Sequence, residues 1–132
     1  MSNLTDQVTT VLAGLNLLEA DVPAVDDVGA QGDVLVSRAS SRRARTPLVE
    51  PVAVVDGEYG GHAHTLHPAG ECFWEQQDLG EVGLKLGVLT VSRGARAFLF
   101  HEEHGGLEIL PGTYRVGRQR EYERGSWRQV AD

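Results

Sequence analysis

The residues best suited to chemistry in this chain are four histidines, which occur as two short clusters. His62 and His64 are separated by one alanine, and His101 and His104 are separated by two glutamates. Imidazole nitrogens bind divalent transition metals, and imidazole also exchanges protons near neutral pH. If the two clusters meet in the folded chain, they would form one metal site or one acid/base site.

The first cluster has the spacing of a strand. Residues two apart on a strand project to the same face, so His62 and His64 are expected to approach one ion together. The second cluster allows two geometries. An extended segment would place His101 beside Glu103, whereas a tight turn into the following glycines would bring His101 and His104 together.

We predict that the ligands of this site are His62, His64, His101 and His104, with Glu103 as an accessory group that orients an imidazole or accepts a proton. The metal would be zinc, iron, nickel or manganese, and an open coordination position would permit hydrolase or oxygenase chemistry. Two other interpretations stay open: histidines that only form structural hydrogen bonds, and acid/base catalysis without a metal. The sequence assigns no catalytic residue.

One helix and a series of short strands must position these residues. Leucines and valines at helical spacing predict an amphipathic helix over Leu4–Glu19, capped by Ser2 or Asn3. The acidic segment Asp21–Asp33 has no periodicity and is expected to be a linker. We therefore expect a helix with its linker over residues 1–30 and an all-β domain over residues 31–132.

From residue 33 onward, short apolar segments alternate with turns rich in glycine and proline. Strands are expected at 33–37, 52–55, 62–66, 71–75, 82–92, 97–101, 107–110, 113–122 and 127–130, with a turn at Asp56-Gly57. This spacing predicts a mostly β fold, either a small antiparallel barrel or a two-layer sandwich. In segment 113–122, alternation places Tyr114 and Val116 on one face, with Tyr114 in the core or an interface.

The strand expected at 97–101 is apolar on both faces. Phe98 and Phe100 share one face and Leu99 lies on the other. Such a strand must be covered on both sides, either by the N-terminal helix or by a neighbouring subunit. A homo-oligomer formed through the helix and residues 97–100 is therefore expected.

Composition limits the functional classes. A net charge of −7 over 132 residues disfavours a protein that binds duplex nucleic acid. No apolar run reaches the roughly 20 residues that span a bilayer, and the N-terminus lacks signal-peptide features, so no membrane partner and a cytoplasmic location are expected. The lone Cys72 cannot form an internal disulfide and is expected to be a small buried hydrophobe.

Phosphate recognition has little support in the sequence. No glycine-rich phosphate loop is present, so no nucleotide cofactor is expected. Four arginines lie close together in a segment rich in serine and alanine: Arg38, Arg42, Arg43 and Arg45. We expect a solvated loop there, and the alternative is a contact with phosphate or an acidic partner.

Several motifs occur together in a fixed order: Gln31-Gly32-Asp33-Val34-Leu35, Gly61-His62-Ala63-His64, His101-Glu102-Glu103-His104, Leu110-Pro111-Gly112-Thr113-Tyr114-Arg115-Val116 and Gln119-Arg120-Glu121-Tyr122. In this order they resemble a group of small bacterial and phage-associated proteins without an assigned activity. The resemblance extends from Gln31 to the C-terminus. It implies a shared fold and a joint role for the four histidines, but no reaction. A competing hypothesis is therefore a non-catalytic, self-assembling scaffold linked to phage or defence functions, with structural histidines.

A weaker likeness is to cupins, which are small β-barrels that hold a metal with His-X-His, a glutamate and a later histidine. His62 and His64 match the first pair. Glu71 follows at a longer spacing than in cupins, and the Pro111-Gly112 turn lacks the later histidine. A histidine of the second cluster would have to take its place.

Overall fold

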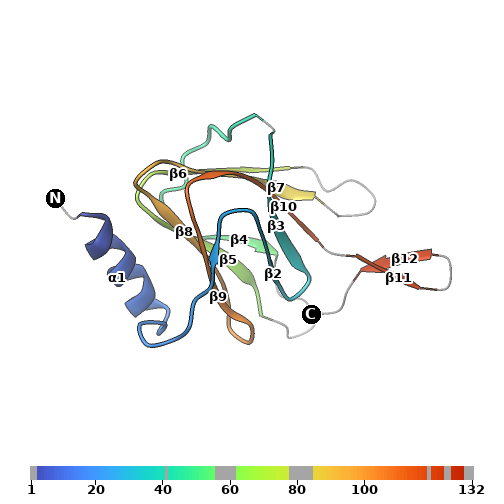
Figure 1. The fold of residues 1–132 in the computed structure, drawn as a ribbon, viewed down its shortest axis with the longest axis horizontal. Helices are drawn as coiled ribbons and strands as arrows, with labels where there is room; N and C mark the ends of the chain where they lie inside the picture. The colour runs from blue at the N-terminus through green and yellow to red at the C-terminus, as the bar shows by residue number, and fades with distance from the viewer. Residues whose placement is uncertain are drawn as a thin grey trace.

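The computed structural model describes residues 3–40, 42–55, 62–77, 85–118, 120–123 and 126–129. Within them, one helix precedes twelve strands (Figure 1). The elements are α1 (Leu4–Gly14), β1 (Ala24–Val25), β2 (Val28–Gln31), β3 (Val34–Arg38), β4 (Val52–Val55), β5 (His64–Ala69), β6 (Cys72–Gln76), β7 (Lys85–Val91), β8 (Arg96–His101), β9 (Gly105–Ile109), β10 (Gly112–Arg118), β11 (Arg120–Glu123) and β12 (Ser126–Gln129).

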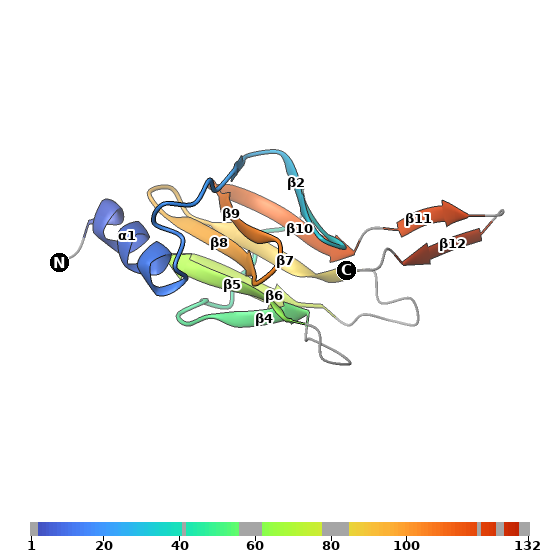
Figure 2. The ribbon, with the colours of Figure 1, turned by 90° about the horizontal axis from the view of Figure 1, so that it is seen from below.

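The strands form a two-layer sandwich (Figures 1 and 2). Sheet A has the order β1-β9-β8-β5-β4, and sheet B has the order β2-β3-β10-β7-β6. Neighbouring strands are antiparallel, except that β1 runs parallel to β9. β11 and β12 pair with each other as a separate hairpin. The predicted mostly β fold is confirmed, and the sandwich rather than the closed barrel is the architecture found.

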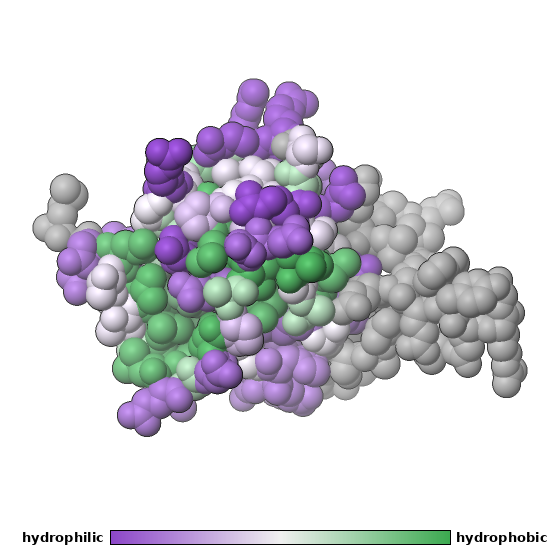
Figure 3. All heavy atoms as spheres, in the orientation of Figure 1, coloured by the Kyte–Doolittle hydropathy of each residue, from purple (hydrophilic) through white to green (hydrophobic). Residues whose placement is uncertain are grey.

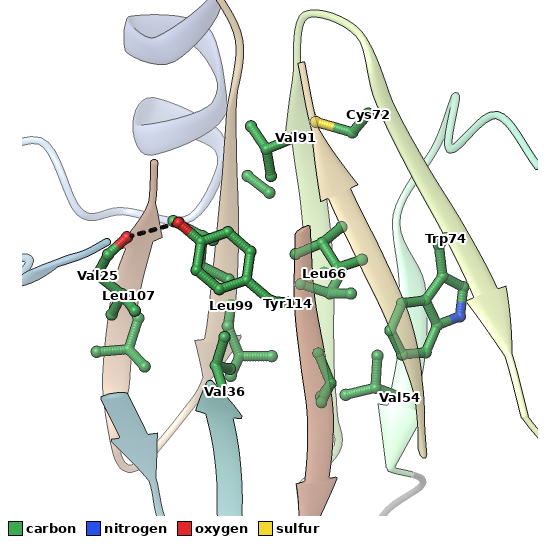
Figure 4. Close-up of a cluster of buried hydrophobic side chains, with 14 of the residues drawn as sticks. Val25, Val36, Val54, Leu66, Cys72, Trp74, Val91, Leu99, Leu107 and Tyr114 are labelled. Atoms are coloured by element: carbon green, nitrogen blue, oxygen red, sulfur yellow. Dashed lines mark hydrogen bonds between the residues drawn. The ribbon is translucent and has the colours of Figure 1, made fainter. Parts of the chain in front are cut away.

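The core lies between the two sheets (Figure 4). Leu66 and Leu99 come from sheet A, Tyr114 and Val116 come from sheet B, and all four side chains are fully buried. Burying a large apolar side chain stabilises the fold by about 1.5–3 kcal/mol. The Tyr114 hydroxyl donates to the carbonyl oxygen of Leu110 at 2.8 Å, so its polar atom is satisfied. Tyr114 and Val116 therefore lie in the core, on the shared face that alternation predicts.

The outer face of sheet A is covered within a single chain. Phe98 of β8 lies opposite His67 of β5 on this face, and it is buried. α1 contacts β5, and a hollow of about 300 Å³ between them is lined by residues that include Val11, Leu15 and His67. Phe98 is thus buried within the single chain, whereas Phe100 on the same face is partly exposed.

The helix is shorter than the sequence predicts. It ends at Gly14, and Asn16 adopts a left-handed conformation (φ 59°) that turns the chain away. Asn3 is the cap, since its side chain accepts from the Asp6 N–H at 2.8 Å. Beyond the helix, Leu17 is buried, whereas Leu18 is 57% exposed. The prediction that the helix continues to Glu19 is therefore wrong.

The segment expected as a linker is partly sheet. β1 and β2 both lie within residues 21–33, and they pair with β9 and β3. Short acidic segments with one apolar face can add a strand at a sheet edge without showing a long periodic pattern. Three other expected features, the Asp56-Gly57 turn and the ends of two strands at 82–84 and 130, lie outside the described residues.

Candidate functional site

The two histidine clusters meet at one end of the sandwich. His64 begins β5 and His101 ends the neighbouring strand β8, and their ring centroids lie 4.3 Å apart. The His104 centroid lies 4.5 Å from that of His101, and the His62 centroid lies 6.1 Å from it. Segments that are distant in the sequence therefore bring four imidazoles into one cluster, as the sequence predicts.

The second histidine segment is a tight turn. It joins β8 to β9, and Gly105 at its end adopts a positive φ of 80° that suits glycine. The backbone N–H groups of Glu103 and His104 donate to Nδ1 of His101 at 3.1 and 3.3 Å. Nδ1 must carry a lone pair to accept them, so the hydrogen of the neutral ring sits on Nε2. Of the two predicted geometries, the turn is the one found, and His101 holds it.

Gln31 ties this end of the two sheets together. Its Nε2 group donates to the carbonyl oxygens of Leu99 at 2.9 Å and Gly105 at 2.8 Å, across from sheet B to sheet A. With both amide hydrogens used, Oε1 must act as the acceptor. His64 therefore donates from Nδ1 to this oxygen, at 3.0 Å.

A carboxylate and a guanidinium lie on the other side of His64. Nε2 of His64 is 3.7 Å from Oδ1 of Asp33, which is longer than a hydrogen bond. Nε of Arg118 is 3.9 Å from Oδ2 of Asp33. Asp33 is only 6% exposed, so the nearby guanidinium offsets part of the cost of burying its charge. We call Gln31, Asp33, His64 and His101 the inner group, because all four are buried.

The remaining members of the cluster lie at the surface. His62, Glu102, Glu103 and His104 are exposed, and we call them the outer group. Nδ1 of His62 is 2.7 Å from Oε2 of Glu102, and its Nε2 is 3.8 Å from Oε1 of Glu103. At this exposure such a pair contributes only about 0–1 kcal/mol to stability. The outer side chains are therefore weakly held and can reorient.

One geometric prediction for the first cluster is wrong. His62 precedes β5 instead of lying in it, so the two-residue spacing of a strand does not apply. As a result, the side chain of His62 is 43% exposed, while that of His64 is fully buried. The two imidazoles occupy different environments and do not present one shared face.

No ready-made metal site is present in the described part of the chain. There, no three histidine, cysteine, aspartate or glutamate side chains are grouped closely enough to hold an ion as they stand. In the inner group, Nδ1 of both His64 and His101 already takes part in hydrogen bonds. The outer group has exposed imidazole and carboxylate atoms, which would bind an ion only after rotating toward it.

Sequence reasoning missed three polar residues of the site: Gln31, Asp33 and Arg118. Gln31 and Asp33 flank Gly32, whose positive φ of 58° makes the turn between β2 and β3. Gln31 and Asp33 belong to the motif Gln31–Leu35 that the sequence shares with the small bacterial and phage-associated proteins, but the motif alone assigns them no role. Which polar side chains of a turn point inward depends on the packing of the opposite sheet, and the local sequence does not encode that packing.

Two other titratable residues lie away from the cluster. His67 is half-buried on the outer face of sheet A, and burial lowers its pKa. Cys72 is buried, and desolvation raises its pKa to about 11. A thiol with that pKa stays protonated and unreactive near neutral pH, so Cys72 is the buried hydrophobe that the sequence predicts.

A family model matches residues 30–119, which run from β2 to the residue after β10. This span covers more than half of the chain. The chain belongs to the DUF8820 family. The family is described as a domain of unknown function. The DUF8820 match contains the whole inner and outer groups and leaves out α1. No curated protein and no solved structure matches the chain. In the described part of the DUF8820 protein, no helix is long and apolar enough to cross a membrane.

Proposed function

We propose that this domain is a non-catalytic binding module that takes a divalent transition metal ion at the outer group of the histidine cluster. The observation that carries the proposal is that His62 lies beside the carboxylates of Glu102 and Glu103, while His62 and His104 both lie beside the ring of His101. Imidazole and carboxylate ligands together suit zinc, nickel, iron and manganese.

The inner group supports the proposal because it holds the backbone that carries the outer group in place. Gln31 bonds to the carbonyl of Gly105, and His101 bonds to two amides of the turn, so the turn that carries Glu102 and His104 has little freedom. A positioned backbone lowers the cost of binding, because only exposed side chains must be ordered, at about 0.5–1.5 kcal/mol each. Arg118 lies beside Asp33 and disfavours a cation in the inner group. The sequence suggests His62, His64, His101 and His104 as ligands. In this proposal His64 and His101 are not ligands but hold the backbone of the site in place.

Isothermal titration of the untagged protein with zinc and with nickel tests the proposal. We expect one ion per chain, and the double variant His62→Ala/His104→Ala should abolish binding. His67→Ala is the matched control, because it also removes an imidazole but lies on the outer face of sheet A. Stoichiometric binding that survives in the double variant, or no binding by the natural chain, would exclude the outer group as a metal site.

A second candidate follows from the hydrogen bonds of His64 and His101. His64 bonds to the side chain of Gln31 and His101 bonds to two amides of the β8–β9 turn, so both can be structural histidines, as the scaffold hypothesis supposes. In that case the protein would bind no metal and would form a defined oligomer. Light scattering over a wide concentration range tests this candidate, and a monomer at every concentration counts against it.

A further inference from the structure

The arginine-rich segment after β3 is fastened along the edge of sheet B. The Trp74 N–H donates to the carbonyl oxygen of Thr46, and the Leu48 N–H donates to that of Cys72, both at 2.8 Å. Pro47 forms a β-bridge with Phe73 between these two bonds. Residues 46–48, which directly follow the arginines, thus run as an additional short strand beside β6.

Two further bonds hold the same backbone closer to the arginines. The Ala44 N–H donates to the Thr90 hydroxyl at 2.9 Å, and Ala44 itself is only 4% exposed. The Arg45 N–H donates to a carboxylate oxygen of Glu75 at 3.2 Å. The backbone is therefore fixed while the arginine side chains stay exposed. This segment runs along the top of Figure 1, where hydrophilic residues gather in Figure 3.

A hollow of about 400 Å³ opens at this place. It is lined by Arg42, Arg43, Ala44, Arg45 and Phe73. Guanidinium groups bind phosphate through paired hydrogen bonds, and the face of an aromatic ring stacks with flat heterocycles. The hollow is within the usual size range of small-molecule sites, roughly 300–1,000 Å³. The guanidinium groups of the three arginines and the ring of Phe73 line one small hollow, which suits a ligand that has both an anionic and an aromatic part.

The overall charge indicates a small ligand. The chain has a net charge of −7, which disfavours the binding of an extended polyanion to the protein as a whole. The one carboxylate that the described contacts place beside the segment, that of Glu75, accepts the Arg45 N–H. Three exposed arginines in an otherwise acidic protein concentrate anions locally.

We infer that this hollow is a binding site for a small ligand that combines phosphate groups with an aromatic ring, the chemistry of a nucleotide. The expectation of no nucleotide cofactor rested on the lack of a glycine-rich loop. Here, three guanidinium groups and a ring would replace that loop. The site is separate from the histidine cluster, because the β8–β9 turn lies at the bottom of Figure 1 and the arginine segment lies at the top.

Calorimetric titration with ADP in the presence of EDTA tests the inference, and the chelator keeps any metal at the histidines out of the measurement. Adenosine and pyrophosphate serve as partial probes, and ADP should bind at least about tenfold more tightly than either. Arg42→Gln/Arg43→Gln should weaken ADP binding by about tenfold or more. Arg93→Gln is the control, because this exposed arginine does not line the hollow and should leave binding unchanged.

Phe73→Leu keeps an apolar side chain but removes the flat ring. It should weaken the binding of ADP and leave that of pyrophosphate unchanged. The inference is overturned if ADP binds more weakly than about 1 mM, if Arg93→Gln has the same effect as the double variant, or if pyrophosphate binds as tightly as ADP. Tighter binding of a single-stranded oligonucleotide than of ADP would overturn the small-ligand assignment. If Phe73→Leu does not fold, the exposed arginines still decide the outcome.

Discussion

Replacing Gln31 by leucine is the sharpest test of how the histidine cluster is held. The side chain is 3% exposed and makes three hydrogen bonds, to Leu99, Gly105 and His64. Leucine has a similar volume, so the substitution removes the polar contacts without leaving a large cavity. Each buried hydrogen bond contributes about 1 kcal/mol net, and unsatisfied partners add to the loss. We expect the free energy of unfolding to fall by about 3 kcal/mol.

Urea unfolding followed by tryptophan fluorescence, to which buried Trp74 contributes, measures this loss. For a domain of this size, about 3 kcal/mol corresponds to a fall in Tm of about 10 °C. The control is Gln76→Leu, which changes an exposed glutamine of β6 and should alter the free energy by less than about 0.5 kcal/mol. If Gln31→Leu costs less than about 1 kcal/mol, Gln31 does not tie the two sheets together.

Nitrogen NMR provides a second check on the same reasoning. In the neutral cluster the hydrogen should be on Nδ1 of His64 and on Nε2 of His101, because their hydrogen-bond partners are opposite in kind. Loss of the Gln31 acceptor should remove the preference in His64 and leave that of His101 in place. The same tautomer in both rings of the natural protein would refute this assignment of the hydrogen bonds.

Four further predictions concern the rest of the fold. Gly14→Ala should raise the free energy of unfolding by about 0.5–1 kcal/mol in urea titrations, because nothing lies within 4 Å of the added Cβ. Gly87→Ala should lower it by more than about 2 kcal/mol, since its Cβ would lie 2.5 Å from the ring of Trp74. Burial raises the pKa of Cys72 to about 11 from the usual 9.0, which stabilises the fold below pH 9 by about 2–3 kcal/mol. This contribution is lost as the pH rises toward 11, so the free energy of unfolding should fall over that range in the natural protein but not, through this group, in Cys72→Ala. The lowered pKa of His67 stabilises the fold above pH 6.5 and the effect is lost as the pH falls below that value, so an NMR titration should give His67 a midpoint under 6.5.

Strand segments and their buried faces could be predicted from the sequence because they depend on local alternation. Tyr114 and Val116 follow the period of two, and both are fully buried. The helix end was harder to place, since Leu17 and Leu18 are both apolar and only the turn at Asn16 decides which of them is buried. Two adjacent leucines are equivalent until the backbone direction is known.

It could be predicted that the histidine clusters meet, but not which histidines are buried and hydrogen-bonded and which are exposed. Residue types and spacing indicated that His64 and His101 belong to one site, and their rings are in contact. His64 is held by Gln31, which reaches it from the other sheet, whereas His101 is held by two backbone amides of its own turn. Contacts across the sandwich are non-local, so no pattern around a histidine can reveal whether its nitrogens are accessible.

The short segment beside β6 has a consequence for how this protein behaves in concentrated solution. An uncovered outer strand offers a row of unpaired amides and carbonyls onto which another chain can add. Here that row is occupied by residues 46–48 of the same chain, and Pro47 presents no N–H of its own to an incoming strand. Sheet B is thereby protected at this edge from aggregation through strand addition. Variants that detach residues 46–48 should aggregate under conditions in which the core is still folded.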